Sequence, residues 1–234
     1  MTWFAPLLLL AFMVLISDYP SNRLLAMMTY DSTDAIMIIL VIVGSTMFSM
    51  EFQNNAILTL LYKSPRALYV YLNKFITIFI YDLILHGLAI IFTFGLATTI
   101  NPVSWLAVYQ YQQPLIVNMF LATGVDILTS MLIISVVFLI STLINSNAVV
   151  VTASLAVMFF GEAISTDLTR GYSALTSLAK WNPFNMTLLT HQYVNYGGYY
   201  DTTLLTNGEL ALGAFVYIVI FFAFGYLVFR QKRY

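Results

Sequence analysis

The amino-acid sequence predicts an all-α polytopic membrane protein in which residues 1–234 form one transmembrane domain with six helical spans. Composition is the first reason, because 61% of the residues are hydrophobic and only 8% are charged, as expected for folding in lipid. The second reason is the pattern, in which long apolar runs alternate with short polar connections. The net charge is −1 and the cations are scattered, so nucleic acid is not expected as a partner.

The first two spans flank a polar stretch at residues 17–33. The apolar run at residues 3–16 lacks a basic leader and a small-residue cleavage site, so we expect a retained span rather than a signal peptide. It is short, because a helix needs about 20 residues to cross about 30 Å of hydrocarbon. Asp34 is placed to cap the second span, which covers residues 35–50.

Residues 51–62 carry helical periodicity although they separate two apolar runs. Polar residues recur at four-residue spacing from Glu51 and Asn55, and an apolar ridge that includes Phe52 lies beside them. A serine directly before Pro65 predicts a turn there and the start of a new helix. The segment is therefore predicted to be an amphipathic helix at the membrane interface.

The third and fourth spans are long apolar runs with clear ends. The third runs from Pro65 to about residue 100, where Asn101 and Pro102 stop it. A loop rich in tyrosine, tryptophan and glutamine leads to the fourth span at residues 115–144. Such aromatic residues are typical of a membrane interface.

The fifth span starts directly after a tight turn at residues 145–147 and is predicted to end near Ile164. Residues 165–208 form the longest region predicted outside the membrane, and their apolar spacing around Pro183 predicts two short helices. The last span covers residues 210–229.

Positive charge assigns the orientation of the spans. Six spans put both termini on one side, and with that side cytoplasmic, six Lys or Arg residues face inward and three face outward. The inward residues are Lys63, Arg66, Lys74, Arg230, Lys232 and Arg233, and the outward ones are Arg23, Arg170 and Lys180. The 51–62 helix is then cytoplasmic and the 165–208 region is outside.

Ionisable residues within the spans are the main candidates for function, because charge inside a membrane is costly. Asp82 and His86 lie one helical turn apart in the third span, and Asp126 lies in the fourth. His86 and Asp126 fall at similar depths, so they could pair across two helices. Three roles stay open: a structural polar clasp, a proton relay, or contact with cargo. Glu162 is either a gate residue at the outer mouth or a helix cap.

The chain has no recognisable machinery for a reaction of its own. The Gly-x-x-x-x-Gly-Lys-Ser/Thr nucleotide loop does not occur in the sequence, so ATP would have to bind a separate protein. With no cysteine and two histidines, neither a metal site nor a bound cofactor is expected.

Residues 51–74 resemble the first cytoplasmic loop of the type II ABC export permeases. In that family a glutamate ends the second span, a leucine pair follows, and then come a proline with an arginine and a lysine that opens the third span. The matching residues are Glu51, Leu60, Leu61, Pro65, Arg66 and Lys74. The sequence departs from the family at three places: at Asn55 and Ala56, where Gly-Thr is usual, at Pro65, which lies one position later than the family's proline, and at Asn73, where glycine is usual.

The resemblance implies a membrane subunit that works with two cytoplasmic ABC ATPase subunits, on which ATP and Mg would bind, and with a second copy or a sister permease. It also implies a re-entrant helical hairpin within residues 165–208 and a multi-pass location in a bacterial plasma membrane. The residues that would couple to the ATPase are Glu51, Phe52, Asn55, Leu60, Leu61, Pro65 and Arg66.

The chain is also similar in size to small Gram-positive peptide exporters, including those for staphylococcal phenol-soluble modulins. The resemblance and the aromatic-rich composition favour export of amphipathic peptide or lipid-like cargo. A proton-coupled secondary carrier that uses Asp82, His86 and Asp126 is the alternative. A membrane-embedded enzyme is a third possibility, but the sequence shows no recognisable catalytic spacing.

Overall fold

Helices make up the regular structure of the described chain. The computed structural model describes residues 4–16, 21–53, 62, 66–144, 146–171 and 175–231, with the backbone alone at 48–53. The helices are α1 (Ala5–Leu15), α2 (Asn22–Met27), η2 (Thr29–Asp31), α3 (Ser32–Gln53), α5 (Ala67–Thr99), η3 (Gln110–Gln112), α6 (Leu115–Leu143), α7 (Asn147–Gly171), α8 (Thr176–Ala179), α9 (Pro183–Met186), α10 (Leu189–Val194), α11 (Tyr196–Thr203) and α12 (Asn207–Gln231).

Five described helices are long and apolar enough to cross a membrane, which confirms the prediction of an all-α polytopic membrane protein. They are α3, α5, α6, α7 and α12. The first predicted span is α1, whose 11 residues rise only about 16 Å, about half of the hydrocarbon thickness. The six-span count and the orientation therefore remain predictions.

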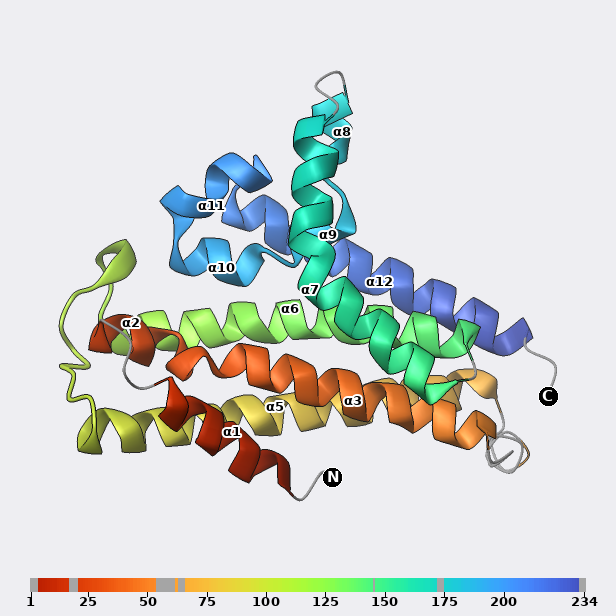
Figure 1. The fold of residues 1–234 in the computed structure, drawn as a ribbon, viewed down its shortest axis with the longest axis horizontal. Helices are drawn as coiled ribbons and strands as arrows, with labels where there is room; N and C mark the ends of the chain where they lie inside the picture. The colour runs from red at the N-terminus through yellow and green to blue at the C-terminus, as the bar shows by residue number, and fades with distance from the viewer. Residues whose placement is uncertain are drawn as a thin grey trace.

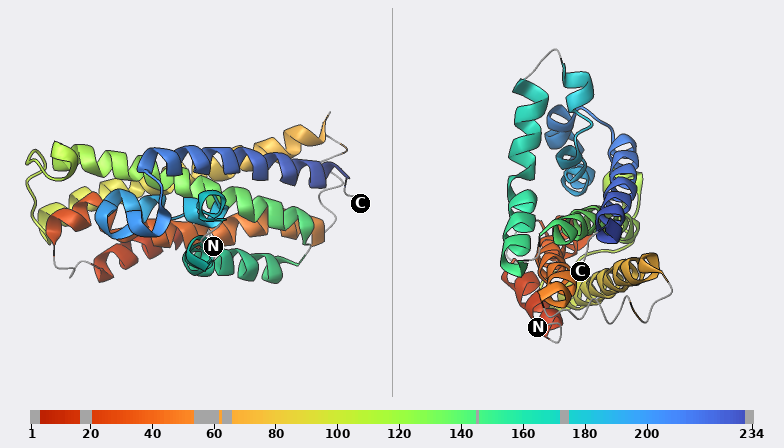
Figure 2. Two further views of the ribbon diagram at one scale, coloured as in Figure 1. Left: turned by 90° about the horizontal axis from the view of Figure 1, so that it is seen from above. Right: turned by 90° about the vertical axis from the view of Figure 1, so that its right-hand side faces the viewer.

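Helix α6 is the centre of the bundle, and it contacts α3, α5, α7, α10 and α12. Figures 1 and 2 show α3, α5, α6 and α12 extending along the long axis of the molecule. Tyr71 of α5 is fully buried where three of these helices meet, with its ring 5.9 Å from that of Phe138 and 5.1 Å from that of Phe222. The long helices are therefore held mainly by apolar and aromatic packing.

The two ends of the bundle collect different connections. The end of α3, the start of α5, the end of α6, the start of α7 and the end of α12 lie at one end, on the right of Figure 1. The end of α5, helix α2 and the start of α6 lie at the opposite end. Successive long helices thus alternate in direction, as expected for a polytopic bundle.

Helix α7 begins beside α3 and α6 and then rises away from them, with α8 next to its far end (Figure 1). It continues to Gly171, so the predicted end near Ile164 is wrong. The continuation is possible because Thr166 and Thr169 donate their hydroxyls to carbonyls one turn back and interrupt no backbone bond.

The region predicted to hold two short helices contains four within its described part, α8 to α11. Asn182 accepts a bond from the Asn185 amide and so caps α9 directly before Pro183. Asn195 caps α11 in the same way through Gly198. These polar caps divide the region more finely than its apolar spacing predicts. Its placement as an outer hairpin remains a prediction.

Candidate functional site: a buried polar network beside an acidic cavity

Asp82 and His86 form a buried pair on one face of α5. His86 Nδ1 lies 3.0 Å from Asp82 Oδ1, and the two side chains are 1% and 0% exposed. The other carboxyl oxygen, Asp82 Oδ2, accepts a hydrogen bond of 2.8 Å from the Ser130 hydroxyl on α6. The predicted one-turn spacing therefore produces a pair within α5, and Ser130 connects that pair to α6.

Asp126 has a different partner from the one predicted. Its Oδ2 accepts a hydrogen bond of 2.8 Å from the Thr33 hydroxyl at the start of α3, and the residue is 3% exposed. His86 bonds within its own helix instead, so the predicted direct pairing of His86 with Asp126 is wrong. The physical reason is that i,i+4 neighbours on one helix meet without any interhelical fit.

Thr190 brings a third helix to the same region. The Thr190 and Thr129 hydroxyls lie 3.1 Å apart and join α10 to α6. The polar contacts of α6 thus reach α5, α3 and α10 within about one helical turn. The three roles considered for Asp82, His86 and Asp126, which are a clasp, a proton relay and a cargo contact, stay predictions.

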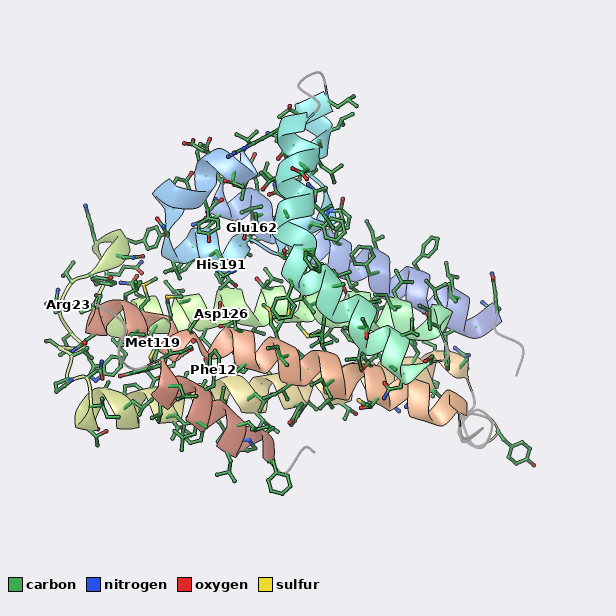
Figure 3. The ribbon with its side chains drawn as sticks, viewed as in Figure 1. Phe12, Arg23, Met119, Asp126, Glu162 and His191 are labelled. Carbon is green, nitrogen blue, oxygen red and sulfur yellow. The ribbon has the colours of Figure 1, made fainter. Side chains whose placement is uncertain are left out.

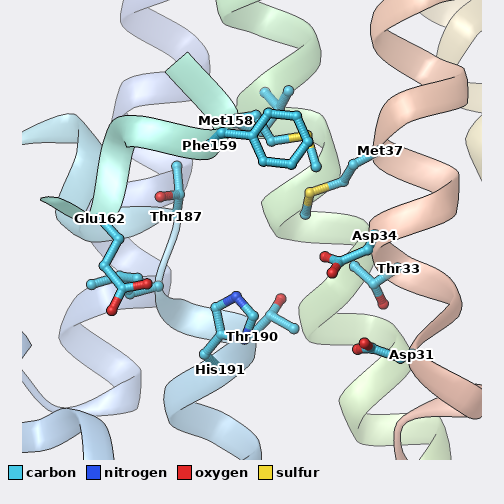
Figure 4. A pocket seen from close by; sticks show the side chains of 12 residues that line it. Asp31, Thr33, Asp34, Met37, Met158, Phe159, Glu162, Thr187, Thr190 and His191 are labelled. Atoms are coloured by element: carbon cyan, nitrogen blue, oxygen red, sulfur yellow. The ribbon is translucent and has the colours of Figure 1, made fainter. Parts of the chain in front are cut away.

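A cavity of about 200 Å³ opens beside this network (Figure 4). Its lining comes from three separate parts of the chain: the start of α3 with η2, the middle of α7, and the stretch from α9 to α10. Thr33 and Thr190 belong to the lining and also bond to Asp126 and Thr129. The cavity and the buried network therefore share a wall.

Carboxylates dominate the charge of the cavity. Asp31, Asp34 and Glu162 line it, together with the single basic side chain of His191 (Figure 4). The carboxyl oxygens of these three acids accept no hydrogen bond and form no ion pair with the residues that the structure describes. The His191 ring stacks on that of Tyr199, with centroids 5.5 Å apart. In Figure 3 the labels of Asp126, Glu162 and His191 mark the region where α6, α7 and α10 meet.

An unusual backbone turn places Asp31. Thr29, Tyr30 and Asp31 have φ angles of 48°, 54° and 54°, a left-handed conformation that costs roughly 1–2 kcal/mol per residue. The turn is held by the fully buried Tyr30 side chain and by a hydroxyl bond of 2.6 Å between Thr29 and Ser32. Asp34 lies in the first turn of α3, so it faces the cavity rather than capping the helix.

Glu162 lies inside α7, far from either end, so the helix-cap alternative is wrong. It is one of the residues that line the cavity, and Figure 4 shows its carboxyl on the α7 side. The neighbouring Gly161 packs closely on α9, since a Cβ there would lie 3.4 Å from the Phe184 ring. A gate role for Glu162 remains a prediction.

Most of the predicted coupling segment lies outside the described residues. Asn55, Leu60, Leu61 and Pro65 fall there, and Glu51 and Phe52 are described by the α3 backbone alone. Arg66 is extended at the start of α5. Lys74, which matches the lysine of the family pattern, is among the described residues. It is buried, and its Nζ donates a hydrogen bond of 3.1 Å to the Met47 carbonyl, which joins α5 to α3 near this end.

A clamp at the opposite end holds the connection between α5 and α6. The Tyr111 hydroxyl donates to the Tyr193 carbonyl at 2.7 Å, and Gln110 Nε2 donates to the Val194 carbonyl at 3.1 Å. Partial burial raises the pKa of the Tyr111 phenol further above neutral pH. The clamp fixes the end of α10, the helix that carries His191 to the cavity.

The sequence singled out Glu162 but not Asp31, Asp34 or His191 as site residues. The sequence signal that could have indicated Asp31 and Asp34 is that these two acids lie three residues apart beside a predicted span. Among the described residues no group of three His, Cys, Asp or Glu side chains is arranged to hold a metal ion. Comparisons with protein-family models, with curated proteins and with solved structures find no match.

Proposed function

We propose that this chain is the membrane subunit of an ATP-binding cassette exporter, driven by a separate cytoplasmic ATPase and active with a second copy or a sister permease in a bacterial plasma membrane. Amphipathic peptide or lipid-like molecules are the proposed cargo. On this proposal the chain itself catalyses no bond chemistry and binds no cofactor, while ATP and Mg bind the ATPase.

The observation that carries the proposal is the resemblance of residues 51–74 to the coupling loop of such permeases. The arrangement of the helices supports it, because the end of α3 and the start of α5 lie at the same end of the bundle as the end of α12 (Figure 1). That end carries Arg66 and Arg230, as expected for a cytoplasmic face. An ATPase bound there would contact both helices that flank the loop.

The buried contacts supply a route from that end to the cavity. Movement of α3 acts on α6 through Thr33 and Asp126, and movement of α5 acts on α6 through Asp82 and Ser130. Both contacts reach the helix that supplies Ile133 to the cavity wall. The proposed mechanism is therefore mechanical: closure of the ATPase dimer shifts α3 and α5, and the shift alters the cavity.

One observation favours a proton-coupled secondary carrier as the second candidate. Nε2 of His86 is buried and has no hydrogen-bond partner among the described residues, while its Nδ1 faces Asp82. A buried pair of this kind can exchange protons when a pathway reaches it. The same pair can also act as a clasp between α5 and α6 in an exporter, so its presence does not separate the two candidate functions. They differ in their source of energy, which is ATP for the exporter and a proton gradient for the carrier.

The test compares energy sources directly. The chain is purified from native membranes with its associated proteins, which are identified by mass spectrometry, and vesicles are prepared with and without the recovered ATPase. We expect an ATPase to co-purify and cargo export to require both proteins and ATP. Transport by this chain alone, or purification of the active protein without any ATPase, would contradict the proposal.

A further inference from the structure

We propose that the acidic cavity binds the ammonium group of an organic cation, the positively charged end of an amphipathic molecule. Its identification with cargo rests on the proposed function, whereas the binding itself does not. The relevant features are the charge of the cavity, its apolar wall and its size.

The charge of the cavity favours a cation. Asp31, Asp34 and Glu162 approach it from three elements, η2, α3 and α7, and His191 is the one basic residue among the described residues that line it. Asp31 and Asp34 are partly buried and Glu162 is exposed. Their carboxyl oxygens have no hydrogen-bond or ion-pair partner among the described residues, so a ligand that enters the cavity can bond to them. An ammonium group offers three donors and a full positive charge, and charge-assisted bonds of this kind are about twice as strong as neutral ones.

The opposite wall of the cavity suits hydrocarbon. Met37, Met158 and Phe159 line it, with their side chains on the side away from Asp31 in Figure 4. Methionine adapts to irregular apolar groups, and an aromatic face attracts a nearby cation. The cavity thus has carboxylates on both its α3 side and its α7 side and an apolar end formed by Met37, Met158 and Phe159, which matches a primary amine attached to a short hydrocarbon segment.

The volume of the cavity and the residues that line it favour a small organic cation over a whole lipid or a metal ion. A volume of about 200 Å³ is below the range of about 300 Å³ and more that is typical of drug-sized ligands, so a side-chain-sized group fits better than a whole lipid. An inorganic cation is disfavoured, because the described residues hold no three-residue metal cluster and the apolar wall would leave a metal ion partly unsolvated.

Binding at this place would be felt by the buried network. Thr33 lines the cavity and donates its hydroxyl to Asp126, and Thr190 lines it and bonds to Thr129. A ligand that draws Asp34 or Thr33 toward the cavity therefore acts on the contact between α3 and α6. This contact is also the one that the proposed mechanism uses to carry movement from the coupling end.

The experiment measures binding to the purified full-length chain in lipid nanodiscs without an ATPase. The probes are three compounds of nearly the same shape: 2-phenylethylammonium, 2-phenylethanol and 3-phenylpropionate. Titration calorimetry, or saturation-transfer NMR for weak binding, gives the affinities. We expect the ammonium compound to bind about tenfold or more tightly than either of the others, since hydrogen bonds to charged groups are worth roughly a factor of ten.

Two substitutions and a matched control locate the site. Asp34→Asn and Glu162→Gln should each weaken binding of the ammonium probe several-fold while the melting temperature stays close to the parent value, because neither carboxyl has a partner to lose among the described residues. Asp167→Asn is the control. It removes a carboxylate from α7, the helix that carries Glu162, but Asp167 lies outside the lining of this cavity, so binding should not change.

Equal affinities for the three probes, no detectable binding, or no effect of Asp34→Asn and Glu162→Gln would overturn the proposal. Displacement of the ammonium probe by submillimolar Mg²⁺ or Ca²⁺ would assign the cavity to an inorganic cation instead and would also overturn it. The proposed function is judged separately. If the ammonium probe binds but no ATPase co-purifies with the chain from native membranes, the cation site stands and the exporter proposal is refuted. ATP-driven export by a chain that does not bind the probe would do the reverse.

Discussion

Replacement of Asp126 by asparagine separates the two candidate functions. The Asp126 carboxyl is 3% exposed, and its Oδ2 accepts the Thr33 hydroxyl at 2.8 Å. An asparagine has nearly the same shape and keeps an acceptor oxygen for Thr33, so the contact between α3 and α6 survives. We expect Asp126→Asn to reduce the free energy of unfolding by at most about 1–2 kcal/mol.

The matched comparison is Asp126→Leu, which removes the acceptor and leaves the buried Thr33 hydroxyl unpaired. An unpaired buried hydroxyl costs about 1–3 kcal/mol, so the leucine variant should be less stable than the asparagine variant by about that amount. Reversible unfolding in mixed detergent micelles measures both variants. Equal stability of the two would show that the Thr33 contact contributes nothing to the bundle.

Transport decides the functional question. In vesicles that contain the ATPase, Asp126→Asn should export cargo with ATP at a rate within several-fold of the parent and should not respond to an imposed pH difference. An amide cannot exchange a proton as a carboxyl does. Transport driven by a pH difference without ATP in the parent, and abolished by Asp126→Asn, would refute the exporter and establish the secondary carrier.

Three further substitutions test other parts of the molecule. Glu51→Lys should uncouple ATP hydrolysis from export while leaving membrane insertion intact, as measured by both rates in the same vesicles; coupled transport at the parent rate would contradict the coupling assignment. Gly225→Ala should lower the free energy of unfolding by about 1–3 kcal/mol through overpacking, because its Cβ would clash with the Tyr71 hydroxyl, and Tyr71→Phe should restore part of the loss. Gln192→Leu should destabilise the α10–α12 region by about 2–3 kcal/mol, since Gln192 donates to the Leu205 carbonyl at 2.8 Å and accepts from Thr203; hydrogen exchange unchanged across residues 189–207 would contradict this.

The sequence predicts the long helices well because a helix that spans a lipid bilayer has to meet simple physical requirements. A span must be apolar and must satisfy its backbone internally, so the ends of α5 and α6 follow from Pro65, from Asn101 and from the polar turn near residue 145. The end of α7 is not predictable in this way. Its polar continuation beyond Ile164 has no helix breaker before Gly171, and the polar residues there mark a change of surroundings rather than the end of a helix.

The site was only partly predictable. Asp82, His86 and Asp126 stand out because ionisable residues are rare in apolar runs, but their partners Ser130 and Thr33 are ordinary residues for a span. The cavity depends on residues about 30 and more than 100 positions apart in the sequence, whose approach follows from packing of whole helices. Local spacing carries no information about such an approach, and this is why His191 did not stand out.

The path of α7 explains why the cavity lies where it does. Val150 and Ser154 are buried in the first half of α7, where it packs on α3 and α6. Beyond them the helix leaves the bundle (Figure 1), and α9 follows it closely at Gly161. The space between the diverging α7 and the start of α3 is the cavity, with Glu162 on one side and Asp34 on the other. Any change in the angle between α7 and α3 therefore changes the separation of these carboxylates. An exporter that rocks α3 would bind a cation when the acids are close and release it when they are apart, with no chemical step in this chain.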